Sequence, residues 1–426
     1  MSEGAAHKAI EALWRIEAGR LIGGLMRVVH DIAVAEDLAQ EAVIAALERW
    51  PTTGIPESPG AWLMATAKNR AFDHLRKQRM QERRHAEIGE DSPALPLPGT
   101  DLDAAVDDDV GDDLLRLIFM ACHPVLSKEG RTALTLKLLG GLTTAELARA
   151  FLVPEATIAQ RIVRAKRTLG EARVPFEMPR LTEMSDRLSS VFEVIYLIFN
   201  EGYAATKGDD WTRPELCEEA LRLGRILAAL VAAEPEVHGL VGLMELHASR
   251  LPARIGASGE PILLFDQNRS RWDQLLVHRG LAALERAEAF NQPLGPYALQ
   301  AAIAACHARA RVVAETDWNR IVALYDALVE LTGSPVVELN RAVAVSMAFG
   351  PSAGLELVDA LADESALKSY HLLPSVRGDL LMRLGRHTEA GVEFERAASL
   401  AQNVRERVLL LARAEESQTT WPARAE

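Results

Sequence analysis

Apolar residues recur at helical spacing along almost the whole chain, and this periodicity constrains the fold more than any other feature of the sequence. Runs of β-branched residues are few, whereas long stretches are rich in Ala, Leu, Arg and Glu, which favour helices. At 426 residues the chain is too long for a single hydrophobic core. We therefore predict an all-α protein of roughly two to four domains.

The net charge of −13 is distributed unevenly. Residues 1–86 have a balance of +1, residues 114–180 have +6, and residues 181–426 have −10. Residues 87–113 carry ten acids and no Lys or Arg. Because this acidic segment also contains Pro and Gly, it can bury little apolar surface and is predicted to be a linker.

The changes in charge and in Pro and Gly content along the chain predict that it is organised in four segments. A helical module over residues 1–86 precedes the linker 87–113, and a second helical module covers 114–178. Prolines between Val174 and Pro179 mark the next boundary. The apolar run SSVFEVIYLIFNEGY then begins a larger helical region over 179–426.

The segment WLMATAKNRAFDHLRK (62–77) predicts an amphipathic helix, since Met64, Ala67, Ala71 and Leu75 share one face. Its other face combines cations that neutralise phosphates with an amide that can read a base edge. The candidate DNA-binding residues there are Asn69, Arg70, Asp73, Arg76 and Lys77. Trp62 falls on the same side and could stack on an unpaired base. A solvated charged face, with Trp62 packed at the helix start, explains this pattern equally well.

A second amphipathic helix is predicted over VAEDLAQEAVIAALERW (34–50). Polar residues cluster near its start, namely Glu36, Asp37, Gln40 and Glu41. Acids in a first turn complement the helix dipole, so their presence alone does not require a function. The Pro- and Gly-rich segment PTTGIPESPGA joins the two helices in a non-helical path.

The segment LTTAELARAFLVPEATIAQRIVRAKRTL (142–169) predicts a helix-turn-helix. Thr143 and Glu146 have capping-box spacing, and Pro154 suits the first position of the second helix. One narrow apolar stripe follows, made of Ile158, Ile162, Ala165 and Leu169. The opposite face carries side chains able to contact base edges in a major groove, namely Thr157, Gln160, Arg161, Arg164 and Arg167.

Over roughly residues 8–172 the chain closely resembles the bacterial extracytoplasmic-function (ECF) sigma factors. The resemblance is carried by three segments in this order: VAEDLAQEAVIAAL, AWLMATAKNRAFDHLRK and GLTTAELARAFLVPEATIAQRIVRAKRTL. The resemblance implies region 2, an acidic linker and region 4. It also implies that the chain directs core RNA polymerase to promoters, with contacts to the clamp helices of the largest subunit and to the flap.

Further roles follow from the resemblance. The helix with Glu36, Asp37, Gln40 and Glu41 would bind the clamp helices, and the loop 52–60 would receive a flipped base of the −10 element. Asn69, Arg70, Asp73 and Arg76 would contact the melted strand or upstream backbone, and Thr157, Gln160, Arg161 and Arg164 would read the −35 element. The linker would thread toward the active-site cleft. The 51–60 loop is unlike the usual family sequence, so the family's −10 preference does not transfer.

The C-terminal region contains one repeat-like signature, VRGDLLMRLGRHTEAGVEFERAASL. Its small and aromatic residues fall at the offsets of a tetratricopeptide helix pair, namely Gly378, Gly385, Ala390, Phe394, Ala397 and Leu400. The resemblance then implies an ECF subgroup with a long C-terminal extension that regulates in cis, through an intramolecular or protein partner. An irregular helical domain with one chance match is the alternative.

Other classes of protein fit less well. A stand-alone helix-turn-helix regulator with a sensing tail leaves the 34–77 pattern unexplained, and a helical-repeat adaptor would not need residues 1–180. An enzyme could use Glu193, Asn200, Glu201, Tyr203 and Asp209, but a helix end explains them, and we predict no catalysis. The three dispersed cysteines and the His spacings indicate neither a disulfide framework nor a metal site, and no cofactor is expected. Without a leader or an apolar span, the chain is expected in the cytoplasm, away from membranes.

Overall fold

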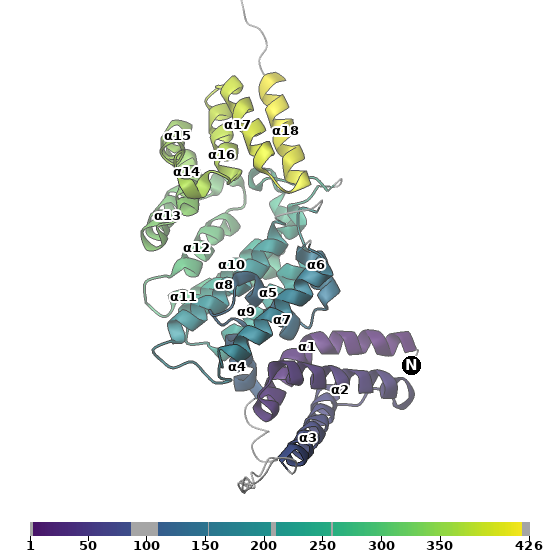
Figure 1. Ribbon diagram of the computed structural model, residues 1–426. Helices are drawn as coiled ribbons and strands as arrows, with labels where there is room; N and C mark the ends of the chain where they lie inside the picture. Colours follow the sequence, from purple (N-terminus) through teal and green to yellow (C-terminus); the bar gives the residue numbers. More distant parts are fainter. Residues whose placement is uncertain (1–2, 87–109, 152, 206–209, 257–258, 420–426) are drawn as a thin grey trace, which may run out of the picture. The chain divides into compact units, whose positions relative to one another are not determined.

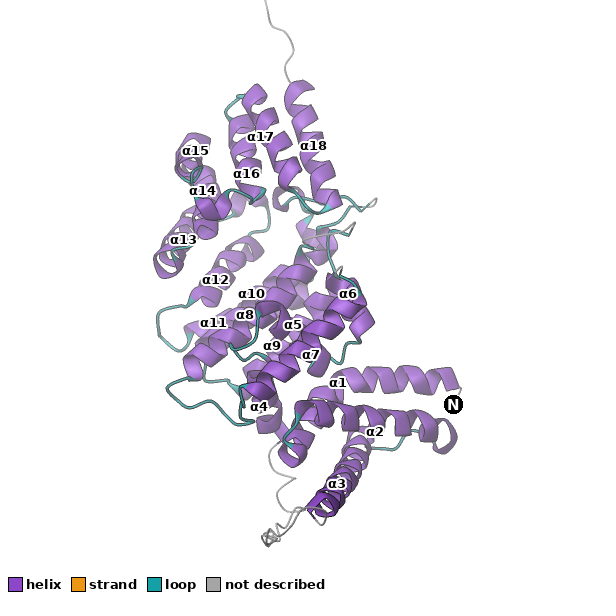
Figure 2. Cartoon of the chain, in the orientation of Figure 1, coloured by secondary structure: helices purple, strands orange, loops and turns teal. Residues whose placement is uncertain are grey.

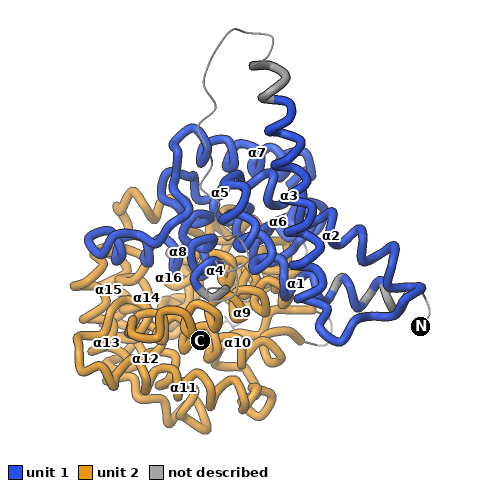
Figure 3. Tube along the Cα trace, turned by 90° about the horizontal axis from the view of Figure 1, so that it is seen from below, with its two compact units in different colours: residues 1–195 blue, residues 196–426 orange. Residues whose placement is uncertain are grey.

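The computed structural model describes residues 3–86, 110–151, 153–205, 210–256 and 259–419. Within these ranges the chain is helical, and the only β pairing is an isolated bridge between Ile255 and Pro261 (Figure 2). The predicted all-α class is therefore confirmed. The chain divides into two compact units, Met1–Ile195 and Tyr196–Glu426 (Figure 3).

The first unit contains seven complete helices and most of an eighth within the described residues (Figure 1). They are α1 Glu3–Val29, α2 Ile32–Thr53, α3 Pro59–Ala86, α4 Val110–Ala121, α5 Lys128–Leu138, α6 Thr144–Phe151, α7 Glu155–Glu171 and α8 Met184–Tyr203. The boundary between the units falls inside α8.

Helices α1, α2 and α3 pack on one another. The carboxylate of Asp31 caps α2 by accepting hydrogen bonds from the Ala33 and Val34 amides at 2.8 and 3.0 Å. Helix α2 continues through Pro51, and Gly54 ends it with φ +83°, a conformation that favours glycine. The non-helical connection to α3 is therefore shorter than the sequence suggested.

The predicted linker 87–113 lies mostly outside the described residues, but its last four residues belong to α4. Asp112 and Asp113 occupy the first turn of α4, where negative charge complements the helix dipole. Asp113 is buried and lies 3.3 Å from the Arg27 guanidinium and 2.8 Å from that of Arg116. The predicted linker therefore ends before residue 113, since its last residues belong to a helix.

The second unit is a succession of helices, each packed on the next in the chain (Figure 1). After the end of α8 they are α9 Pro214–Leu230, α10 Pro235–Ala248, α11 Gln274–Glu288, α12 Pro296–Arg309, α13 Trp318–Thr332, α14 Pro335–Phe349, α15 Pro351–Ala360, α16 Leu372–Arg383, α17 His387–Leu400 and α18 Val404–Thr419. Short 3-10 helices include η1 Leu251–Ala253, η2 Leu264–Asp266, η3 Arg269–Arg271, η4 Val313–Glu315 and η5 Ser365–Leu367.

The close approach of α16 and α17 depends on one glycine and one aromatic ring. A Cβ on Gly378 would lie 2.8 Å from the Phe394 ring, so only glycine lets the two helices come this close. Phe394 is fully buried, as are Ala390 and Ala397 on the same helix. The small and aromatic residues of the repeat-like signature thus form the contact between these helices.

Candidate nucleic-acid interface

Helix α7 is held in place by its apolar stripe and by the turn before it. Ile158, Ile162, Ala165 and Leu169 are all buried, as predicted, and α7 packs on α5 and α6. The capping box of α6 is also present. The Thr143 hydroxyl accepts from the Glu146 amide at 3.1 Å, and a Glu146 carboxylate oxygen accepts from the Thr143 amide at 2.7 Å. Pro154 is the N-cap of α7 rather than its first residue.

The other face of α7 presents the predicted DNA-binding residues to solvent. Gln160, Arg164 and Arg167 are exposed, and Thr157 and Arg161 are half-buried. Arg167 lies 3.4 Å from Glu171, whereas Arg161 and Arg164 form no ion pair among the described residues. These two guanidinium groups keep their full capacity to contact phosphates or base edges.

Helix α3 carries the second predicted DNA face. Asn69, Asp73, Arg76 and Lys77 are exposed, and Arg70 is half-buried. Arg70 donates to Glu41 of α2 at 2.7 Å, and Arg76 lies 3.5 Å from Asp73. Exposed ion pairs of this kind contribute little stability, so both cations can exchange these partners for phosphates.

Trp62 packs within the protein. Its ring meets the buried ring of Trp50 edge-on, with centroids 5.3 Å apart. The pair joins the first turn of α3 to the last turns of α2. The sequence alone left open whether Trp62 faces DNA or fastens the helix start, and this contact gives it a structural role.

The four predicted polymerase-binding residues of α2 do not form one exposed surface. Asp37 and Glu41 are exposed and Gln40 is half-buried, but Glu36 is only 4% exposed. The Glu36 carboxylate pairs with Lys166 of α7, lies 3.7 Å from Lys137 of α5, and accepts from Gln40 at 2.9 Å. This burial could not be predicted from local sequence patterns, because the two lysines lie far along the chain from Glu36.

Further contacts join the same helices within the first unit. Arg15 of α1 pairs with Glu146 of α6 at 2.6 Å. Arg27 of α1 pairs with Asp113 of α4; burial raises the pKa of Asp113, and Arg27 lowers it in part. A cavity of about 580 Å³ is lined by residues of α1, α2, α4 and α7, including Lys166, and by His30 between α1 and α2. These contacts hold the helices of the two predicted DNA-binding modules against one another, an arrangement that we call closed.

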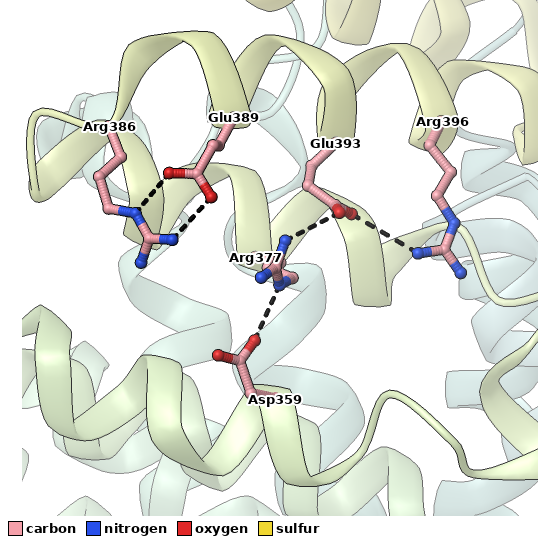
Figure 4. A network of polar contacts seen from close by, with 6 residues as sticks. All are labelled: Asp359, Arg377, Arg386, Glu389, Glu393 and Arg396. Atoms are coloured by element: carbon pink, nitrogen blue, oxygen red, sulfur yellow. Dashed lines mark hydrogen bonds and ion pairs between the residues drawn. The ribbon is translucent and has the colours of Figure 1, made fainter.

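The second unit contains a polar network across three successive helices. Arg377 of α16 donates to Asp359 of α15 at 2.8 Å and to Glu393 of α17 at 2.9 Å (Figure 4). Hydrogen bonding to Asp359 raises the pKa of Arg377. Arg396 lies 3.8 Å from Glu393, and a cavity of about 260 Å³ adjoins these groups.

Two of the carboxylates considered for an enzyme, Glu193 and Glu201, pair with cations. Glu193 pairs with Lys128 and Arg131 at 2.6 and 3.1 Å; burial raises its pKa, but these hydrogen bonds lower it overall. Glu201 pairs with Arg213, and Asp209 lies outside the described residues. In the described part of the chain, no three His, Cys, Asp or Glu residues are placed to hold a metal, and no helix has the length and apolar character to cross a bilayer.

Three successive segments of the chain match known protein families. Residues 13–80 match the family described as Sigma-70 region 2, and residues 116–169 match Sigma-70, region 4. Residues 187–288 match a family of unknown function (DUF6596). The first match contains α2 and most of α3, and the second contains the helix-turn-helix.

Similar proteins fall into two kinds. An uncharacterized protein of Rhizobium meliloti (strain 1021) is 42% identical over 397 residues, which cover 90% of each chain. The ECF RNA polymerase sigma factor SigK of Mycobacterium ulcerans is 30% identical over 154 residues, covering 35% of this chain and 78% of SigK. The RNA polymerase sigma-H factor of Pseudomonas aeruginosa is 29% identical over 162 residues, covering 37% of this chain and 81% of that protein.

Proposed function

The chain belongs to the ECF RNA polymerase sigma factors, which direct core polymerase to promoters, and on this premise we propose which of its residues carry out recognition. Helix α7 enters the major groove at the −35 element, and α3 contacts the −10 region. The observation that carries the proposal is that the guanidinium groups of Arg161 and Arg164 form no ion pair with the residues that the structure describes. They lie opposite a buried stripe that fixes the orientation of α7. This family initiates transcription and is not enzymatic, and we place its action in the cytoplasm with the polymerase.

Core polymerase would bind α2 through Asp37, Gln40 and Glu41, whose side chains reach solvent. Glu36 joins this surface only if its contacts with Lys137 and Lys166 break. We therefore infer that the closed arrangement belongs to the free protein and that docking on the clamp helices opens it. Opening would also separate α3 from α7. Such a separation is needed because the −10 and −35 elements lie apart on one duplex and the two helices would contact them at the same time.

The second unit would act as a tetratricopeptide-like regulatory domain in cis. Its support is the series of successive helix contacts and the small-residue contact of Gly378 with Phe394. The similarity to the R. meliloti protein extends over 90% of both chains, so the two proteins share this region as well. Its acidic balance would suit contact with cationic surfaces.

Transcription in vitro with bacterial core polymerase on the promoter region of this protein's own gene tests the assignment. Arg161→Ala and Asn69→Ala should each lower the yield from a fixed start site by about 10-fold, since each removes a promoter contact worth about 1–3 kcal/mol. Arg286→Ala, an exposed arginine of α11, serves as the control and should leave the yield unchanged. Duplex binding without polymerase, and no transcript, would instead indicate a stand-alone regulator.

A further inference from the structure

The second unit packs three arginines against aromatic rings. Arg254 is 8% exposed, and its guanidinium carbon lies 3.7 Å from the centroid of the Tyr203 ring. Arg250 and Arg269 both lie over the ring of Trp272, at 5.6 and 5.1 Å from its centroid. Tyr203 ends α8, Arg250 and Arg254 flank η1, and Arg269 and Trp272 belong to η3 and its C-cap, so separate parts of the chain converge here.

The positive charges are hydrogen-bonded but not neutralised. Arg254 donates to the Tyr203 carbonyl at 3.1 Å, and Arg250 donates to the Gln267 side chain at 3.3 Å. Arg269 donates to the Ala310 carbonyl at 2.7 Å. Among the described residues none of the three arginines forms an ion pair. Burial lowers the pKa of Arg250 and of Arg269, with Glu315 acting in the opposite direction on Arg269, as expected for cations without a close carboxylate.

The same residues hold a concentration of unused hydrogen-bonding atoms. Five buried groups in the described part of the chain have no hydrogen-bond partner here: the Nε atoms of Arg254 and Arg269, the Nε1 atoms of Trp211 and Trp272, and the hydroxyl of Tyr203. The Arg254 guanidinium lies 5.6 Å from the Trp211 ring centroid, which links Trp211 to the others. Native proteins leave few buried donors unpaired, so a cluster of them indicates a missing acceptor.

We propose that the cluster of Tyr203, Trp211, Arg250, Arg254, Arg269 and Trp272 binds a small anion through its carboxylate or phosphate oxygens. Such a ligand brings negative charge and several acceptors, and a guanidinium pairs with either oxyanion in a fork. All six residues fall in the segment that matches the family of unknown function. The site does not depend on promoter recognition, and it gives the second unit a small-molecule ligand.

Thermal unfolding and titration calorimetry of the full chain test this site with two probes, inorganic phosphate and citrate. Chloride at matched ionic strength is the baseline. An anion that binds the site should raise the melting temperature of the protein by about 2–4 °C when its concentration is well above its dissociation constant. A response to phosphate alone assigns a phosphoryl ligand, and a response to citrate alone assigns a carboxylate ligand.

Two variants distinguish specific anion binding at this cluster from nonspecific effects of salt on stability. Arg254→Met should abolish the response. Trp272→Phe keeps an aromatic ring but deletes one donor, and it should weaken binding about fivefold without unfolding the protein. Arg286→Ala should respond as the wild type does. The proposal is overturned if neither anion acts beyond chloride, or if Trp272→Phe binds as tightly as the wild type. Either result would mean that water satisfies these donors.

Discussion

Glu36 illustrates how much a single carboxylate can decide in this protein. It is 4% exposed and belongs to the proposed polymerase-binding set of α2, yet it pairs with Lys166 of α7. A buried charge that loses its partner is costly, so the closed arrangement holds only while the lysines remain. The closed arrangement therefore competes with the proposed polymerase contact for the same side chain.

Lys166→Met should weaken the closed arrangement. We expect a lower melting temperature, since Glu36 keeps only Lys137 as a cationic partner, and about 3–10-fold tighter binding to core polymerase, because less free energy is spent on opening. Biolayer interferometry with immobilised core enzyme measures the affinity. Lys128→Met is the matched control, because Lys128 is 64% exposed and its partner Glu193 is not on α2. Equal affinities for Lys166→Met and the wild type would contradict the opening step.

At the scale of the elements, local patterns predicted much of the fold. The stripe of α7 is buried at all four predicted positions, and the Thr143–Glu146 capping box forms, because helical spacing and caps depend on near neighbours. The burial of Glu36 was not predictable, since its lysine partner is 130 residues away. The packing of Trp62 on Trp50 was left open for a related reason, as it depends on how α2 and α3 pack.

Gly378→Ala should separate α16 from α17. Its Cβ would lie 2.8 Å from a fully buried ring, so we expect a loss of about 1–3 kcal/mol in the free energy of unfolding, measured by chemical denaturation. Adding Phe394→Leu should make the combined loss smaller than the sum, since the shorter side chain makes room. Gly170→Ala, which meets no heavy atom within 4 Å in α7, is the control and should not destabilise. If the losses in the free energy of unfolding of the two substitutions were additive, the Phe394 ring would not be what opposes a side chain at position 378.

At the scale of the whole molecule, α8 belongs to both units. Arg131 of α5 is 7% exposed, donates to Ser190, and lies 3.1 Å from Glu193, and both partners are on α8. A chain that ended near residue 178 would leave this buried cation without either partner. A chain that ends after Tyr203 keeps them and removes most of the second unit.

The chain 1–203 should therefore initiate transcription in vitro with a yield that differs from that of the full-length protein by about threefold or more. If the second unit masks the DNA-binding modules, chain 1–203 should give a higher transcript yield than the full-length protein. If the second unit makes a contact with polymerase that transcription requires, chain 1–203 should give a lower yield. The direction of the change in yield therefore identifies the mechanism. Circular dichroism checks that the shorter chain is folded. Identical yields would remove the regulatory role from the proposal.

The pairing of Arg131 with α8 also has a consequence during synthesis on the ribosome. The chain emerges from its N-terminus, and Glu193 follows Arg131 by 62 residues. At bacterial elongation rates of about 5–20 residues per second, this gap lasts about 3–12 s. During that interval Arg131 of the nascent α5 is without its α8 partners, so the first unit reaches its final stability only after α8 has been translated.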